Sequence, residues 1–447
     1  MNSRLTRHGV QIPINSLTID ERNKVKSDLT VSPLHTEYIL KPVSYKIYSE
    51  SKNNLYVPRF YKSFHKLVSL PPFAKIDVKF AGNLKESTCQ ISASKAVLDK
   101  LASDTGCLLS LPTGYGKTTV ALHVISALGM KTLIVVHKEF LMNQWVDKIQ
   151  QFLPNARVGK IQGSVMDVEN KDVVVGMLQS LSSREYPGHV FADFGLTVID
   201  ETHHICARTF SRIFTKFNTA YVLGLSATLE RKDGLTHVIH HFLGDVAFFT
   251  ERKNQTKVVV KTVKIAHDIP FPTNALGKVN MSEAVTMLTS MTGRNTMLLS
   301  VLEEMDPGRK ILVLSDRREH CKWLCDYLEK NNKNAGLYIG GMKAEELYQS
   351  EQKTIIIGTY ALAHEGLDIP TLDCVVLATP KSNINQAVGR ILRETPGKRF
   401  DPLIVDLMDI WGPFISQYQQ RKRYYVETGF TLGEGNSNSS YVFQQDA

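Results

Sequence analysis

Residues 111–118 read Leu-Pro-Thr-Gly-Tyr-Gly-Lys-Thr, and this stretch decides the fold of the chain. It follows an apolar run at 106–111 and precedes an amphipathic segment at 117–128, so the local pattern is strand, loop and helix. Backbone N–H groups at a helix N-terminus bind phosphate oxygens. Position 111 carries leucine where the general phosphate-loop pattern has glycine. A chance Gly-Lys-Thr turn is the alternative, but the placement between strand and helix favours a phosphate-binding loop.

Each residue of this loop has an expected task at a bound nucleotide. Lys117 is expected to reach the β- and γ-phosphates, and the Thr118 hydroxyl is expected to hold Mg²⁺. Gly114 and Gly116 let the backbone approach the phosphates closely. The expected nucleotide-binding residues of this stretch are Pro112, Thr113, Gly114, Tyr115, Gly116, Lys117, Thr118 and Thr119.

Two adjacent carboxylates follow a second apolar run. Residues 198–203 read Val-Ile-Asp-Glu-Thr-His, an apolar strand that ends in Asp200 and Glu201. Neighbouring carboxylates at one strand end are electrostatically costly unless a cation lies beside them. Asp200 is therefore the candidate Mg²⁺ ligand, and Glu201 the candidate base that orients and deprotonates water. His203 and His204 are either metal ligands or polar linkers, and the other motifs favour linkers.

Apolar strands alternate with amphipathic helices from about residue 84 onward. This alternation implies parallel sheets covered on both faces. The predicted fold class is α/β, with two tandem parallel-sheet domains and a small β-rich N-terminal accessory region. The expected strands are 106–111, 132–136, 172–176, 196–199, 221–225, 310–314, 354–357, 374–377 and 403–405; the expected helices are 91–101, 117–128, 140–152 and 318–330.

The same patterns give five segments. Residues 1–83 form a basic N-terminal arm and accessory domain, in which 1–30 are polar and aperiodic and are expected to be flexible or loosely packed. Aromatic residues at 45–64 could stack on bases, but a small core is the preferred interpretation. The others are a first domain at 84–250, a linker or insertion at 251–285, a second domain at 286–432 and a disordered tail at 433–447.

Charge and composition narrow the class of protein. The 447 residues carry a net charge of +9, and residues 1–80 hold 13 Lys/Arg against 6 Asp/Glu, a net +7. A basic segment of this kind favours a polyanionic partner, although a solvated surface is the alternative. The apolar runs are strand-length, and the N-terminus has no apolar signal-peptide region. Six cysteines are too few for a disulfide scaffold, so we expect reduced thiols in an intracellular protein.

Four further stretches, taken with the phosphate loop, resemble the motifs of the superfamily 2 helicases. Residues 200–203, Asp-Glu-Thr-His, resemble the DExH box, and residues 226–228, Ser-Ala-Thr, resemble the motif that couples ATP state to strand binding. Residues 386–393 resemble the QxxGRxxR motif, and Thr359 with 365–370 resembles motif V. Ser-Ala-Thr alone carries no information, but the ordered set, over about residues 85–410, is very specific.

This resemblance implies two RecA-like domains that hydrolyse ATP, with Mg²⁺, in the cleft between them. Because Arg390 and Arg393 lie in the second half of the chain, they must cross that cleft to stabilise charge on the transferring phosphoryl group. The implied catalytic residues are Lys117, Glu201, Gln386, Arg390 and Arg393. The implied coupling residues are His203, Ser226, Ala227, Thr228, Gly366 and Asp368.

The resemblance also implies contacts to nucleic acid and to adenine. Backbone-reading motifs place His137, Lys138, Gln179 and Thr359 against the phosphates, where they read no sequence. Helicases of this kind carry an adenine-reading glutamine before the phosphate loop. Gln90 is the candidate, although it lies several residues earlier than the pattern places it.

Within the superfamily, the sequence is most similar to the XPB-like branch and to helicases of large nucleocytoplasmic DNA viruses. The similarity rests on residues 133–138 with 143–145, on the Arg-x-Asp extension within 225–234, and on 56–61. If the chain is viral, the expected places are the host cytoplasm or nucleus and the virion.

Three functions fit these observations. The leading one is an ATP-dependent DNA helicase or duplex translocase that works with transcription or repair machinery. The second is an RNA helicase with the same ATPase chemistry, since nothing in the sequence reads a 2′-hydroxyl. The third is a nucleic-acid-stimulated ATPase that remodels complexes without separating strands.

Overall fold

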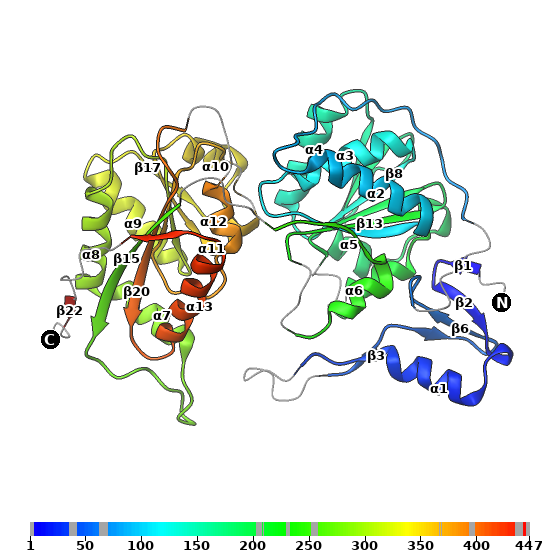
Figure 1. Cartoon of the computed structure of the whole chain (residues 1–447), viewed down its shortest axis with the longest axis horizontal. Helices are drawn as coiled ribbons and strands as arrows, with labels where there is room; N and C mark the ends of the chain where they lie inside the picture. The colour runs from blue at the N-terminus through cyan, green and yellow to red at the C-terminus, as the bar shows by residue number, and fades with distance from the viewer. Residues whose placement is uncertain are drawn as a thin grey trace. The chain divides into compact units, whose positions relative to one another are not determined.

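Two parallel β-sheets, one in each half of the chain, organise the structure (Figure 1). The computed structural model describes residues 4–34, 43–61, 70–202, 208, 210–228, 233–251, 258–365, 367, 369–392, 398–433 and 441–443. The chain divides into two compact units, Met1–Glu251 and Arg252–Ala447. No helix in the described ranges is both long and apolar enough to span a membrane.

The first unit contains an eight-stranded sheet in the order β10-β9-β11-β8-β12-β13-β7-β14. All neighbouring strands pair in parallel except β10 with β9. The strands are β7 (Gly106–Ser110), β8 (Thr132–Val136), β9 (Val158–Gln162), β10 (Val165–Met166), β11 (Val173–Met177), β12 (Leu196–Asp200), β13 (Tyr221–Ser226) and β14 (Val246–Phe249). The helices are α2 (Gln90–Asp104), α3 (Lys117–Leu128), α4 (Glu139–Phe152), α5 (Leu178–Ser183) and α6 (Thr236–Leu243), with 3₁₀ turns at Gly188–Phe191 and Phe210–Thr215.

Helices cover both faces of this sheet, because alternate residues of each buried strand point to opposite sides. Leu109 packs in one apolar cluster with residues of α2, α3 and α4. Leu108 packs in another with residues of α5 and α6. Figure 1 shows α2, α3 and α4 together on the side of the sheet away from the N-terminal strands. This arrangement explains why the strands read as continuous apolar runs.

The N-terminal accessory region adds a four-stranded antiparallel sheet in the order β1-β2-β6-β5 and a two-stranded pair, β3 with β4. Its elements are β1 (Arg4–Thr6), β2 (Gly9–Pro13), the 3₁₀ turn Ile14–Ser16, α1 (Ile19–Asp28), β3 (Thr30–Val31), β4 (Tyr45–Lys46), β5 (Ser49–Glu50) and β6 (Asn54–Val57). Its apolar residues belong to the same cluster as those of α5 and α6, so the accessory region packs on that face of the core.

For residues 4–30, the expectation of a flexible or loosely packed arm is therefore wrong. Val10 and Ile12 alternate with polar residues in β2 and are buried, and Leu29 after α1 is also buried. A capping box fixes the start of α1, because the Thr18 hydroxyl accepts from the Glu21 N–H and the Glu21 carboxylate accepts from the Thr18 N–H. These strands are too short and polar to stand out from composition, and they are stable only against the core.

Arg59 fastens the accessory region to the sheet. Its guanidinium donates to the Thr219 oxygen at 2.8 Å, to the Ala220 oxygen, and to the Thr105 hydroxyl at 2.8 Å. The side chain is buried, and burial lowers the pKa of Arg59 to about 10. Thr105 and Ala220 precede β7 and β13, so Arg59 fixes the accessory region at the amino-terminal ends of two central strands.

The second unit contains a parallel sheet in the order β17-β18-β16-β19-β20-β15-β21, with β22 also paired to β15. Its strands are β15 (Val259–His267), β16 (Ile311–Ser315), β17 (Ala335–Tyr338), β18 (Ile355–Thr359), β19 (Cys374–Leu377), β20 (Leu403–Ile410), β21 (Thr431–Gly433) and β22 (Tyr441–Phe443). Its helices are α7 (Met281–Ser290), α8 (Thr292–Glu303), α9 (Arg318–Lys330), α10 (Ala344–Glu351), α11 (Tyr360–Glu365), α12 (Asn385–Ile391) and α13 (Phe414–Glu427). Apolar clusters lie on both faces, one with α8 and α9 and one with α11, α12 and α13.

The segment predicted as a linker or insertion, 251–285, needs a partial correction. Its residues 259–267 form β15, which pairs along its length with β20, so this part belongs to the second sheet. The sequence did not mark it as a core strand because β15 mixes two lysines and a threonine with apolar residues, whereas strands such as β16 and β19 are almost entirely apolar. The predicted disordered tail, 433–447, lies mostly outside the described residues.

Candidate active site

Strand register brings three loops of the first unit to one edge of its sheet. Ser110 of β7 pairs with Ser226 of β13, and Leu225 of β13 pairs with Asp200 of β12. The three strands are adjacent, so about 10 Å separates the outer two. The loops that follow Ser110, Asp200 and Ser226 therefore start side by side at the carboxyl ends of parallel strands, where α/β sheets bind ligands.

The phosphate loop leads directly into the N-terminus of α3. Gly114 and Gly116 have φ of 89° and 80°, in the left-handed region that favours glycine. Gly116 is the residue before the first turn of α3, and its oxygen accepts from the Val120 N–H at 3.0 Å. Lys117 Nζ donates to the Leu111 oxygen at 3.0 Å, so the ammonium group folds back over the loop. The loop thus presents helix N–H groups and an ammonium at one place.

The Gln90 side chain is hydrogen-bonded to the phosphate loop. Its Nε2 donates to the Tyr115 oxygen at 2.9 Å, and its Oε1 accepts from the Lys85 N–H at 2.9 Å. The side chain is buried, and a Cβ at Gly116 would lie 2.4 Å from Gln90 Nε2. Both amide atoms are thus engaged with backbone. Gln90 therefore supports the phosphate loop in this structure, and its expected role with adenine stays a prediction.

Asp200 and Glu201 end β12 in an unusual conformation. Glu201 has φ of 50°, which is rare for a residue with a side chain, and its N–H donates to Asp200 Oδ1 at 3.0 Å. Burial raises the pKa of the Asp200 carboxyl to about 6, and the Glu201 carboxylate adds to the rise. The Trp145 hydrogen bond and the Lys117 charge act in the opposite direction. Such a carboxylate is stabilised by a cation.

The contact between Trp145 and Asp200 was not predicted from the sequence. Its indole Nε1 donates to Asp200 Oδ2 at 2.9 Å from the buried face of α4. The sequence offers one signal for this contact, since the indole N–H of a buried tryptophan needs a hydrogen-bond acceptor. With the Glu201 N–H on Oδ1, both oxygens of Asp200 are oriented by hydrogen bonds.

The predicted coupling residues follow β13. The buried Ser226 hydroxyl donates to the Thr228 oxygen at 2.6 Å and accepts from the Thr228 N–H at 3.2 Å, so Ser226, Ala227 and Thr228 form a closed turn. This turn leaves the sheet between the phosphate loop and Asp200. His203, the other predicted coupling residue of this unit, lies outside the described residues.

The predicted nucleic-acid residues of this unit meet at the ends of β8 and β11. Gln179 Nε2 donates to the His137 oxygen at 2.6 Å, which ties α5 to the residue after β8. Burial and the charge of Lys138 lower the pKa of His137, against the effect of Glu201 and Asp200. His137 thus lies close enough to Asp200 and Glu201 to feel their charge, and the next residue, Lys138, is exposed.

The predicted site residues of the second unit are only partly described. Thr359 ends β18, and Arg390 lies on α12 with 8% of its surface exposed. Gln386 also lies on α12, but its side chain is outside the described part. Gly366, Asp368 and Arg393 fall on residues that the structure does not describe.

The first unit has the donor set that a magnesium nucleotide needs. The two glycines and the start of α3 form a cradle without side chains for phosphate. Asp200 and Thr118 offer the oxygen ligands that Mg²⁺ prefers. The oriented oxygens and the raised pKa of Asp200 fit a carboxylate that lies beside a cation.

Comparison with known proteins places both units in one family. The family model described as "Type III restriction enzyme, res subunit" matches residues 83–231, and "Helicase conserved C-terminal domain" matches residues 293–395. A protein of Acanthamoeba polyphaga mimivirus, named as an ATP-dependent RNA helicase, is 33% identical over 454 residues, which cover 97% of this chain and 86% of the relative. A protein of Invertebrate iridescent virus 6, named as a helicase, is 26% identical over 88% of this chain and 89% of its own length.

A solved structure supports the fold. A fragment described as an HsdR subunit of a type I restriction enzyme from Vibrio vulnificus superposes with a TM-score of 0.52 at 20% identity. The match covers 71% of this chain and 63% of that one. At this identity the likeness concerns the fold, which is two RecA-like parallel-sheet domains.

Proposed function

Because this chain belongs to the superfamily 2 helicases, and is therefore an ATP hydrolase that acts on nucleic acid, we propose that it is a DNA translocase or helicase. The observation that carries the chemistry is the shared edge of β7, β13 and β12, with the phosphate loop, the Ser226 turn and Asp200 on adjacent strands. We assign its work to transcription or repair, on the resemblance of residues 225–234 to the XPB-like branch.

In this proposal each residue of the first unit has one task. The amides of 114–118 and the Lys117 ammonium bind the phosphates, and Asp200 and Thr118 hold Mg²⁺, which neutralises phosphate charge when bound. Glu201 accepts the proton of the attacking water. Trp145 and the Glu201 N–H keep the Asp200 oxygens oriented. Arg390 and Arg393 are proposed to stabilise charge on the transferring phosphoryl group.

Coupling to nucleic acid is proposed to run through the same strand ends. The Ser226 turn lies between the phosphate loop and Asp200, and the loops after β8 and β11 follow on the other side of Asp200. His137, Lys138 and Gln179 are joined there, and Lys138 is exposed. These groups, with Thr359, suit phosphate contacts that carry no sequence information.

An RNA helicase is the second candidate, because the mimivirus relative and an African swine fever virus relative are both named as ATP-dependent RNA helicases. Steady-state ATPase rates, measured separately with single-stranded DNA, duplex DNA and RNA of one sequence, distinguish the two. We expect DNA to stimulate turnover at least severalfold more than RNA. Stronger stimulation by RNA would replace DNA by RNA as the substrate.

A matched pair of variants tests the assigned ATP site in the same assay. Lys117→Ala should lose hydrolysis by a factor of at least about a hundred, since it removes charge from the phosphates without disturbing the core. Lys95→Ala, an exposed lysine on α2, is the control and should keep full activity. A folded Lys117→Ala protein with near-normal turnover would show that the assignment is wrong.

A further inference from the structure

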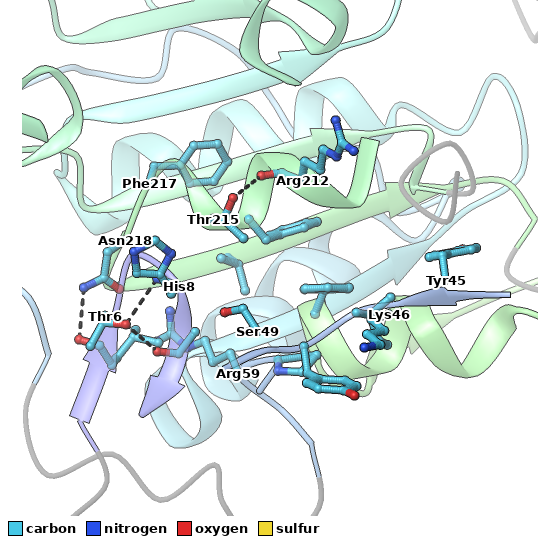
Figure 2. Close-up of a pocket in the computed structure, with 18 of the residues that line it drawn as sticks. Thr6, His8, Tyr45, Lys46, Ser49, Arg59, Arg212, Thr215, Phe217 and Asn218 are labelled. Atoms are coloured by element: carbon cyan, nitrogen blue, oxygen red, sulfur yellow. Dashed lines mark hydrogen bonds between the residues drawn. The ribbon is translucent and has the colours of Figure 1, made fainter. Parts of the chain in front are cut away.

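A cavity of about 470 Å³ lies inside the first unit, between the accessory region and the core (Figure 2). Residues of β1, β4 and β5 form one wall, and Arg208, described residues within 212–219, Val222 and Phe242 form the other. Its volume is in the range of cavities that hold small ligands or parts of larger ones. None of the predicted site residues lines it.

This cavity lies at the opposite edge of the sheet from the ATP site. Thr219 precedes β13 and Val222 is the second residue of that strand, whereas the Ser226 turn follows its end. At about 3.3 Å per residue, the four residues from Val222 to Ser226 put roughly 13 Å between this lining residue and the Ser226 turn. Arg59, which also lines the cavity, fixes this edge through its contacts to Thr219 and Ala220. The cavity therefore cannot be part of the nucleotide site.

The charged groups among its described lining residues are all basic. They are Lys46, Arg59, Arg208 and Arg212, together with the imidazole of His8, and none of the described lining residues is an aspartate or a glutamate. Lys46 and Arg212 are exposed, and neither makes an ion pair with a described residue. Figure 2 shows Lys46 on the accessory strand and Arg212 on the core segment, so each wall carries one of these two cationic side chains. Such a site attracts an anion.

Aromatic rings supply the other half of the chemistry. Five of them line the same cavity: Tyr45, Tyr48, Phe214, Phe217 and Phe242. Phe214 stacks on Phe242 with ring centroids 4.5 Å apart, and Lys46 Nζ lies 5.7 Å from the centre of the Tyr48 ring. Ser49 and Thr215 add hydroxyl groups. Cations that bind phosphate, interleaved with rings that stack on bases, are the combination that binds single-stranded nucleic acid.

We propose that this cavity, referred to here as the accessory pocket, binds an unpaired nucleotide of a single-stranded nucleic acid. Lys46 and Arg212 contact its phosphates, and Tyr48 or Phe214 stacks on its base. A duplex keeps its bases paired and stacked on one another, so only an unpaired base can enter. The proposal rests on the proposed function and deepens it, because it gives the protein a second binding site for the separated strand.

The test compares two double charge reversals in the full-length protein. Lys46→Glu/Arg212→Glu alters the accessory pocket. Lys24→Glu/Lys95→Glu is the control, because it makes the same charge change at an exposed lysine of the accessory region and one of the core. Fluorescence anisotropy with a labelled oligothymidylate measures affinity between 50 and 300 mM salt. We expect the pocket variant to bind about tenfold or more weakly, with a log–log salt slope smaller by about 1.4 for two lost phosphate contacts. The control variant should change the affinity and the salt slope by no more than about half of these amounts.

Two further measurements make the test specific. An abasic oligonucleotide of the same length should bind the unaltered protein about tenfold more weakly than oligothymidylate, because it cannot stack. Tyr48→Leu should reduce this difference and leave ATP hydrolysis without nucleic acid unchanged. Polyglutamate is the competitor that represents an acidic peptide, and it should displace oligothymidylate poorly.

The possible outcomes separate the two levels of the proposal. If the unaltered protein binds neither oligothymidylate nor duplex DNA, the proposed function itself fails; if it binds duplex DNA alone, the accessory pocket is not a site for single strands. If it binds but both charge-reversal variants behave alike, the accessory pocket is not a nucleic-acid site. Equal binding of abasic and normal strands, or efficient displacement by polyglutamate, would also overturn it.

Discussion

Two buried side chains hold the ATP-site residues in place through hydrogen bonds. Trp145 donates its indole N–H to Asp200, and Gln90 bridges the Lys85 N–H and the Tyr115 oxygen. Sequence motifs could place Gln90 near the loop but could not reveal its contacts, because backbone partners carry no side-chain signature. A residue that holds the loop acts on every nucleotide alike, whereas one that reads adenine acts on ATP selectively.

This difference gives the first prediction, at the scale of one residue. Gln90→Leu keeps the side-chain size but leaves the Tyr115 oxygen and the Lys85 N–H without their partner. We expect about a tenfold loss of nucleotide affinity, which corresponds to about 1.4 kcal/mol. Calorimetric titration with ATP and with GTP is the measurement. Equal losses indicate loop support, and a loss confined to ATP would show that adenine recognition dominates.

At the scale of elements, the central strands and helices were predictable and the peripheral ones were not. The ranges predicted for α3, β8, α9 and β19 agree with the structure at both ends, because uniform apolar runs and strong helical periodicity define them. The elements β15, α1 and β1 were missed or misread. They are partly polar, and their pairing is decided by distant residues.

The strand β20 shows how polar residues inside a core strand are accommodated. Asp409 is buried, and Arg294 of α8 donates to both its oxygens at 2.7 and 2.8 Å, while His267 of β15 pairs with it at 2.8 Å. Burial would raise the pKa of Asp409, but the charge and hydrogen bonds of Arg294, with those of His267, lower it overall. The network joins α8, β15 and β20.

Removal of one partner from this network gives the second prediction. Arg294→Met should lower the free energy of unfolding by about 3–5 kcal/mol, because it leaves a buried carboxylate without its cation. Because the folded pKa of Asp409 lies below the unfolded one, its stabilisation is present above about pH 4 and is lost as pH falls further. Urea unfolding at pH 7 and pH 3 measures both effects. Arg294→Met/Asp409→Leu should recover most of the loss at pH 7, and no recovery would show that the pair is not the cause.

At the scale of the whole molecule, the two units have separate apolar cores and carry different parts of the predicted chemistry. The phosphate loop, Asp200 and Glu201 lie in the first unit, and Arg390 lies in the second. Two assembled domains could be predicted from the sequence, because each half has its own strand–helix alternation and its own motifs. The accessory pocket could not, since its walls come from residues far apart in the chain.

This division gives the third prediction. Residues 1–251, expressed alone, should bind nucleotide but hydrolyse it at least about a hundredfold more slowly than the full chain, since Arg390 is absent. In the full chain, Arg390→Ala should cut kcat by a similar factor and change nucleotide affinity much less, as expected for a contact made in the transition state. Circular dichroism checks that the fragment is folded. Turnover by the fragment at the rate of the full chain would contradict the role of Arg390.

A ribosome makes β7 long before the strands that flank it. β7 ends at Ser110, but its neighbours β13 and β14 begin only at Tyr221 and Val246. At about 5–20 residues per second, the finished strand waits roughly 5–20 s for β13 to be translated. A nascent chain in that interval carries the phosphate loop on an apolar strand with no sheet to enter. Transiently exposed apolar surface is what chaperones bind, so we expect the strand that leads into the phosphate loop to be a chaperone target during synthesis.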